Sequence, residues 1–165
     1  MVERDTTAAL TLSFEGEDPL WYESTQRSYD FVAGMVVPFF PIFPVRLMVS
    51  SEYAEGSVEN SGDEDSWPIW TISGPAEDLV IVNNTTGKTI DLTGITVPDA
   101  GQLIIDCNPA AKSVLLDGID SIATLTLASE LFPLALGANS ITVKLNNPDS
   151  GTTVNVAFTR RYFTP

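Results

Sequence analysis

Histidine is absent from this chain of 165 residues, and basic residues are few. The lack of histidine removes the commonest general base, the usual serine or cysteine triad and most zinc sites. Lysine and arginine together number 8 against 22 aspartates and glutamates, which gives a formal net charge of −14. Because so acidic a surface repels phosphate, nucleic acid and anionic membranes are poor partners for this protein.

Cysteine is almost absent too, because Cys107 is the only one. A single cysteine excludes an intramolecular disulfide, so a cytosolic origin is the default. Cys107 ends an apolar run and has no histidine partner, which predicts a buried, unreactive thiol. The longest apolar region, residues 31–49, is interrupted by three prolines and Arg46, so it does not predict a membrane-spanning helix.

Helix signals are scarce, whereas strand signals recur along the whole chain. Hydrophobic residues still make up 44% of the sequence, which is enough for a folded core. Val154, Val156 and Phe158 alternate with polar or small residues, as a half-buried strand requires. Further strands are expected at residues 9–14, 28–32, 69–73, 79–82, 89–92, 102–106, 113–116 and 140–145. This spacing predicts an all-β fold, an antiparallel sandwich or a barrel.

Turn residues punctuate these strands at short intervals. Residues 83–87 (Asn-Asn-Thr-Thr-Gly) lie between two apolar runs and predict a hairpin, because Asn and Gly tolerate a positive φ. Asp117-Gly118 predicts a second hairpin between residues 112–116 and 119–127. Residues 136–139 predict a third turn and residues 146–151 a polar loop. One helical turn is expected at residues 128–131.

The composition changes near residue 50, where we place a domain boundary. Residues 34–44 interleave proline with phenylalanine and isoleucine, which predicts an extended arm or an edge strand. Residues 51–66 hold six acids and no base. The strands expected within residues 1–32 are too few to bury a core alone, so they must dock elsewhere. The prediction is therefore an N-terminal unit, residues 1–50, and a β domain, residues 51–165.

Several residue groups carry a chemical hypothesis beside a structural one. The acids of residues 63–65 could bind a hard cation, but they lack the spacing of a calcium loop, which favours a solvated loop. Trp67 and Trp70 could offer a sugar-stacking platform, yet a spacing of three places them on opposite faces of a regular strand, which favours packing. Residues 160–163 (Arg-Arg-Tyr-Phe) could anchor an acidic partner, such as a neighbouring copy, or end a strand in solvent. No pair of acids has a spacing that predicts a glycosidase.

The order of the motifs resembles the phage distal tail protein family, a siphophage tail-tip family. The resemblance spans nearly the whole chain, and its motifs are weak singly but moderately specific in sequence. They are Asp18-Pro19 with Trp21-Tyr22, the Pro/Phe arm at residues 38–44, residues 58–63 leading to 67–69, residues 72–75, 83–88, 101–106, 131–134 and 137–139, and Arg161-Tyr162.

The resemblance implies a galectin-like, jelly-roll-like β-sandwich after an N-terminal pair of strands and the arm. In that family six copies form a ring that joins the tail tube to the tip or baseplate proteins, and the N-terminal half of each subunit builds the ring. The resemblance further implies that this chain begins inside the last strands of that half, so that residues 1–50 are a remnant of it. The usual lectin carbohydrate set, which centres on His and Arg, cannot be assembled without histidine.

Three functions are therefore weighed. The first is a structural protein of the virion tail tip, made in the bacterial cytoplasm and without enzyme activity, catalytic residues, metal or cofactor. Its contacts with other copies and other tail proteins would use Phe39, Phe40, Ile42 and Phe43 of the arm, since exposed apolar patches mark interaction sites. The second is a carbohydrate-binding adhesion module that uses Trp67 or Trp70. The third is an acid-pair hydrolase, for which no residue pair stands out.

Overall fold

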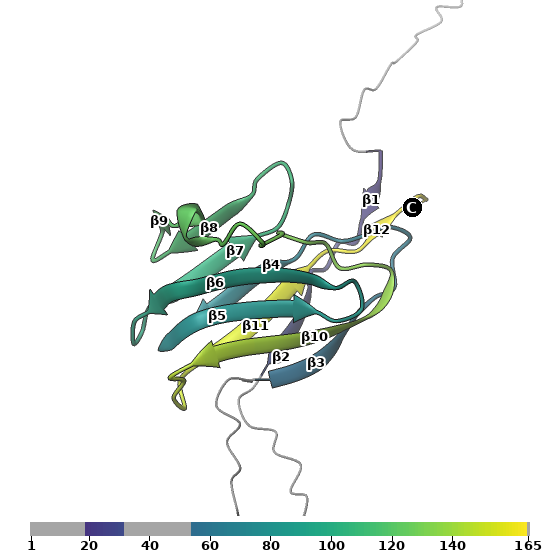
Figure 1. The fold of residues 1–165 in the computed structure, drawn as a ribbon. Helices are drawn as coiled ribbons and strands as arrows, with labels where there is room; N and C mark the ends of the chain where they lie inside the picture. Colours follow the sequence, from purple (N-terminus) through teal and green to yellow (C-terminus); the bar gives the residue numbers. More distant parts are fainter. Residues whose placement is uncertain (1–18, 32–53, 165) are drawn as a thin grey trace, which may run out of the picture.

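The computed structural model describes residues 19–31 and 54–164, and these residues form an all-β, antiparallel sandwich (Figure 1). Their only helical element is a short 3-10 turn, η1 (Ile122–Thr124). The strand expected at residues 9–14 and the Pro/Phe arm lie outside the described residues. The predicted fold class, an antiparallel β-sandwich, is confirmed.

Two sheets and a separate two-stranded ribbon make up the structure. The four-stranded sheet has the order β3 (Ala54–Asn60), β10 (Gly137–Asn146), β5 (Ala76–Asn83), β6 (Lys88–Val97). The six-stranded sheet has the order β2 (Arg27–Phe31), β11 (Thr153–Phe158), β4 (Ile69–Ser73), β7 (Gln102–Asp106), β8 (Ser113–Leu116), β9 (Ile119–Asp120). The ribbon pairs β1 (Trp21–Tyr22) with β12 (Arg161–Tyr162).

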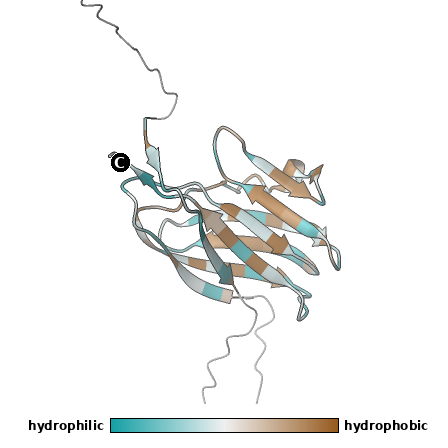
Figure 2. Cartoon of the chain, turned by 180° about the vertical axis from the view of Figure 1, so that it is seen from behind, coloured by the Kyte–Doolittle hydropathy of each residue, from teal (hydrophilic) through white to brown (hydrophobic). Residues whose placement is uncertain are grey.

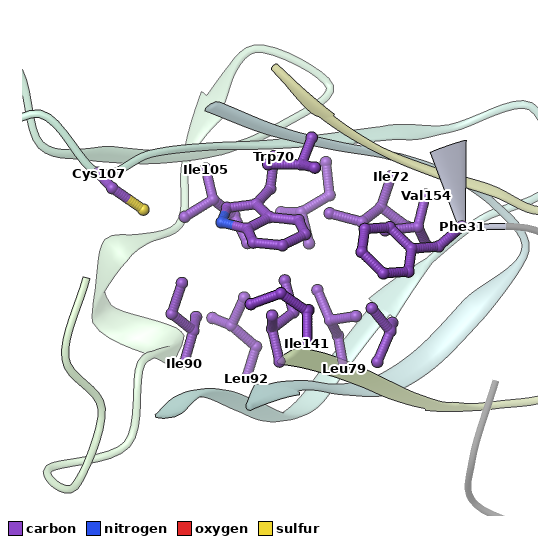
Figure 3. Close-up of a cluster of buried hydrophobic side chains, with 14 of the residues drawn as sticks. Phe31, Trp70, Ile72, Leu79, Ile90, Leu92, Ile105, Cys107, Ile141 and Val154 are labelled. Carbon is purple, nitrogen blue, oxygen red and sulfur yellow. The ribbon is translucent and has the colours of Figure 1, made fainter. Parts of the chain in front are cut away.

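The core lies between the two sheets, where each strand presents every second side chain. Trp70 and Ile105 of the six-stranded sheet face Leu79 and Ile141 of the four-stranded sheet, and all four are fully buried (Figure 3). The view from behind shows hydrophobic and hydrophilic residues alternating along the strands (Figure 2). Burial of this apolar surface is the main force that holds the sheets together.

The turns follow from their local residues. β5 and β6 form the predicted hairpin, in which Gly87 has φ 72° and donates its N–H to the carbonyl of Asn83 at 2.8 Å. β8 and β9 are joined by Asp117 and Gly118, with φ values of 50° and 80°. Two positive φ values in succession are the mark of a tight type I′ hairpin turn.

Three segments differ from the prediction. The acidic stretch of residues 51–66 contains strand β3, which pairs with β10. The strand expected at residues 119–127 is only two residues long, and the helical turn falls at Ile122–Thr124 and not at residues 128–131. The third turn is shorter than predicted, because β10 already begins at Gly137.

The N-terminal strands belong to the same body as the rest. β2 pairs with β11 as the first strand of the six-stranded sheet, and Phe31 at its end is part of the buried core. Residues 21–31, which the prediction grouped with residues 1–50, are therefore paired with strands of residues 51–165.

Candidate functional site

The acids of residues 63–65 hold the end of the chain in place. The backbone N–H of Asp63 donates to the carbonyl of Arg161 at 2.8 Å, and the carboxylate of Asp63 accepts from the N–H of Phe163 at 3.1 Å. Nη1 of Arg161 donates to the backbone carbonyl of Asp65 at 2.9 Å. Across residues 19–31 and 54–164, no group of three or more Cys, Asp and Glu side chains could hold a metal ion.

Trp67 and Trp70, considered as a sugar-stacking platform, differ in how deeply they are buried. Trp70 is fully buried in the core, so its ring has no face open to a pyranose. Trp67 is half-buried and packs against the edge of the same core. The structure does not bring the two rings together on an exposed face.

Cys107 lies in the core, close to the end of the indole of Trp70 that carries its nitrogen (Figure 3). Burial raises the pKa of its thiol to about 12, and the neighbouring carboxylate of Asp106 acts in the same direction. A thiol with so high a pKa carries almost no thiolate at neutral pH and is a poor nucleophile. Cys107 therefore fills space in the core and is a poor candidate for a nucleophile.

Exposed aromatic side chains gather on the two-stranded ribbon, at one end of the molecule. We call β1, β12 and Phe163 together the aromatic ribbon. Trp21, Tyr22 and Phe163 are 55%, 54% and 59% exposed. Trp21 lies opposite Tyr162, and Tyr22 lies opposite Arg161, whose guanidinium carbon is 5.9 Å from the centre of the Tyr22 ring. Apolar side chains this exposed are candidates for contact with another protein.

Two arginines beside the aromatic ribbon interact with the carboxylate of Glu23, which directly follows β1 in the chain. Arg27 forms an ion pair with Glu23, and Arg160 lies 3.9 Å from the same carboxylate. The hydrogen bond from Arg27 lowers the pKa of the Glu23 carboxyl below its ordinary value. Residues 160–163, for which the sequence left open an anchor for a partner or a strand end in solvent, make contacts with their own chain through Arg160 and Arg161.

A second exposed apolar group is aliphatic and lies at the opposite edge of the six-stranded sheet from β2. Its members fall within one short stretch of chain around β9 and η1, and we call them the aliphatic cluster: Ile119, Ile122 and Leu127. Leu127 is fully exposed. The other predicted contact residues, Phe39, Phe40, Ile42 and Phe43, lie outside the described residues.

Sequence reasoning named residues 160–163 as a possible anchor for a partner, but it missed their pairing with Trp21-Tyr22 and missed the aliphatic cluster. The aromatic ribbon joins residues about 140 positions apart, as Trp21 and Tyr162 are, and no local pattern predicts such a pairing. A local signal did exist for the aliphatic cluster, since the tight turn at Asp117-Gly118 is followed by isoleucines that a two-residue strand cannot bury.

These features define a β-sandwich whose described residues expose apolar side chains in two separate groups. Within the described residues no helix is long and apolar enough to cross a membrane.

Comparison with known families gives the class a name. Residues 61–162 match the family model of the siphovirus-type tail component, C-terminal domain. The match covers more than half of the chain, so the chain belongs to this family of phage tail components. Neither a search of curated proteins nor a search of solved structures gave a match.

Proposed function

We propose that this protein is a structural component of the tail tip of a phage or prophage particle, which links the tail tube to tip or baseplate proteins through protein–protein contacts. The family match over residues 61–162 carries this proposal. The exposed aromatic ribbon supports it, because exposed apolar patches mark contact surfaces. Its place would be the distal end of the virion tail, after synthesis in the host cytoplasm.

The protein works by homotypic contact as well, in a homo-oligomer for which the family resemblance suggests a hexameric ring. A repeated head-to-tail contact closes into a ring when its rotation allows. The Pro/Phe arm supplies one side of the contact through Phe39, Phe40, Ile42 and Phe43. No step of this function makes or breaks a covalent bond, so neither a cofactor nor a catalytic residue is needed.

The substitution Phe40→Asp tests this proposal. A carboxylate in the centre of an apolar contact is desolvated without a partner, and we expect it to abolish assembly while the sandwich stays folded. Light scattering reports the mass of the particle, and circular dichroism reports the fold. Leu127→Asp introduces the same charge at a fully exposed apolar residue outside the arm and serves as the matched control. Assembly of Phe40→Asp like the unaltered protein would count against the proposal.

A further inference from the structure

We propose that the aromatic ribbon is the receptor for the Pro/Phe arm of a second copy of this chain, residues 38–44. The inference rests on the proposed function, in which the arm makes homotypic contacts, and adds the surface that the arm binds. Three observations carry it: the residue types of the ribbon, the spacing of the prolines, and the place where the arm joins the sandwich.

The ribbon has the composition of an interface hot spot. Both of its faces present an aromatic ring, because Trp21 lies opposite Tyr162 on one face and Tyr22 lies opposite Arg161 on the other. More than half of the surface of Trp21 and of Tyr22 is exposed. Tryptophan, tyrosine and arginine are the residues that most often dominate the binding energy of protein interfaces.

The arm has the matching sequence. Pro38, Pro41 and Pro44 recur at every third residue, which is the period of a polyproline II helix. In that conformation the three prolines share one face. Segments of this type bind surfaces lined by aromatic side chains, since the extended helix is already formed and little conformational entropy is lost.

The sandwich attaches the arm at the end that is remote from its own ribbon. β2 begins at Arg27, opposite Phe158 and next to the ribbon, and ends at Phe31. β3 begins at Ala54 and ends at Asn60, after which Glu64 pairs with Arg161 of the ribbon. Both strand ends that flank the arm, Phe31 and Ala54, therefore lie at the far end of β2 and β3 from the ribbon (Figure 1).

This attachment favours a neighbour's ribbon over the chain's own. About ten residues separate Phe31 from Pro41, so the arm reaches about 35 Å when fully extended. To contact its own ribbon it would have to turn back along the whole length of the sandwich and use most of that reach. A second copy whose ribbon meets the far end of β2 and β3 is within easy range. The contact joins two different surfaces, so it can repeat around a ring.

The charge distribution is compatible with a contact between an uncharged arm and the ribbon of a second acidic copy. Each chain carries a net charge of −14, so most approaches of one copy to another are repulsive. Arg27, Arg160 and Arg161 lie at the ribbon end, whereas the only other basic residues of the described chain are Lys88, Lys112 and Lys144. These arginines offset most of the charge of the acids at the same end, Glu23, Asp63, Glu64 and Asp65, and residues 38–44 carry no charge, so the contact adds little repulsion between copies.

A complementation experiment with the full chain tests the inference. The arm variant is Phe40→Asp, and the ribbon variant combines Trp21→Ser with Phe163→Ser at two exposed positions. Each variant alone is expected to be monomeric by native mass spectrometry, because each lacks one side of the contact. An equimolar mixture keeps one intact arm and one intact ribbon, so it should give a heterodimer of twice the chain mass. Leu127→Asp, the control in the aliphatic cluster, should assemble like the unaltered protein.

The outcomes separate this inference from the proposed function. If the arm variant is monomeric but the ribbon variant assembles normally, the arm binds elsewhere and the ribbon inference is overturned, while the proposed function stands. Normal assembly of the ribbon variant is also the outcome expected if residues 1–18 of the same chain cover the ribbon. A mixture that gives no heterodimer also overturns the inference. Normal assembly of the arm variant contradicts both proposals, and thermal melting confirms that each variant is folded.

Discussion

The ring of Phe31 lies directly against the backbone of Gly56, so closely that a Cβ at position 56 would be 2.9 Å from Cε1 of Phe31. Phe31 ends β2 in one sheet and Gly56 lies in β3 of the other, so this contact closes the side of the sandwich where the arm is attached. Phe31 also packs on Trp70, with ring centres 5.9 Å apart. Through these contacts with Gly56 and Trp70, Phe31 packs the end of β2 into the core.

Gly56→Val is expected to lower the free energy of unfolding by about 1–3 kcal/mol, because the new side chain must displace the Phe31 ring from its packed position. Urea denaturation followed by circular dichroism measures the change. Ser57→Val, at the exposed next residue of β3, should change stability by less than about 0.5 kcal/mol. Equal effects of the two substitutions would show that the contact does not constrain position 56.

Asn139→Ala is expected to cost about 2–3 kcal/mol of stability, since it leaves buried polar groups without partners. The Asn139 amide accepts from the side chain of Asn83 at 3.0 Å, accepts from the N–H of Ala135 at 3.0 Å and donates to the Ala135 carbonyl at 2.8 Å. Chemical denaturation provides the measurement. Asn108→Ala, at an exposed turn, is the control and should cost no more than about 1 kcal/mol. A loss for Asn139→Ala no greater than that of the control would mean that the network adds nothing to stability.

Trp70→Ala is expected to lower stability by about 3–5 kcal/mol, as removal of a large core ring does. Trp67→Ala should cost less, because Trp67 is only half-buried at the edge of the core. Thermal and urea unfolding of the two variants give the comparison. Saturable glycan binding that is lost in a folded Trp67→Ala variant would instead support the carbohydrate-binding alternative.

The folded protein should react very slowly with a thiol reagent at pH 8. The pKa of Cys107 is raised from 9.0 to about 12, which lowers the thiolate fraction about 1,000-fold at that pH. Burial limits access of the reagent further. In urea above the unfolding transition the same thiol should react at the rate of an ordinary cysteine. Fast reaction of the folded protein would show that Cys107 is not held in the core as described.

Strands with a strong hydrophobic alternation, and turns rich in Asn and Gly, were predictable from sequence because their signals are local. Residues 69–73, 102–106 and 113–116 match their predicted bounds. β3 was missed because its outward residues include Glu55 and Glu59, and because Val58 is its one large apolar residue on the inward side, which is too weak a hydrophobic pattern to mark a strand. The backbone pairing of β3 with β10 holds it in the sheet, and this long-range contact leaves no pattern in the sequence of β3.

The proposed contact surfaces were predictable only in part, for a similar reason. The apolar character of the arm is visible in the sequence, but the exposure of Trp21 and Phe163 depends on the pairing of β1 with β12. That pairing joins the two ends of the described chain, and only the completed sandwich brings them together. Likewise, the burial of Trp70 follows from the packing of two sheets and not from its neighbours in sequence.

The central proposal is that this tail component assembles with copies of itself through rigid β surfaces and the proline-rich arm. Native mass spectrometry of the full chain, at micromolar concentration and moderate salt, tests it most directly. The account predicts a defined oligomer, with six chains as the expected number. A strict monomer across the accessible concentration range would contradict it.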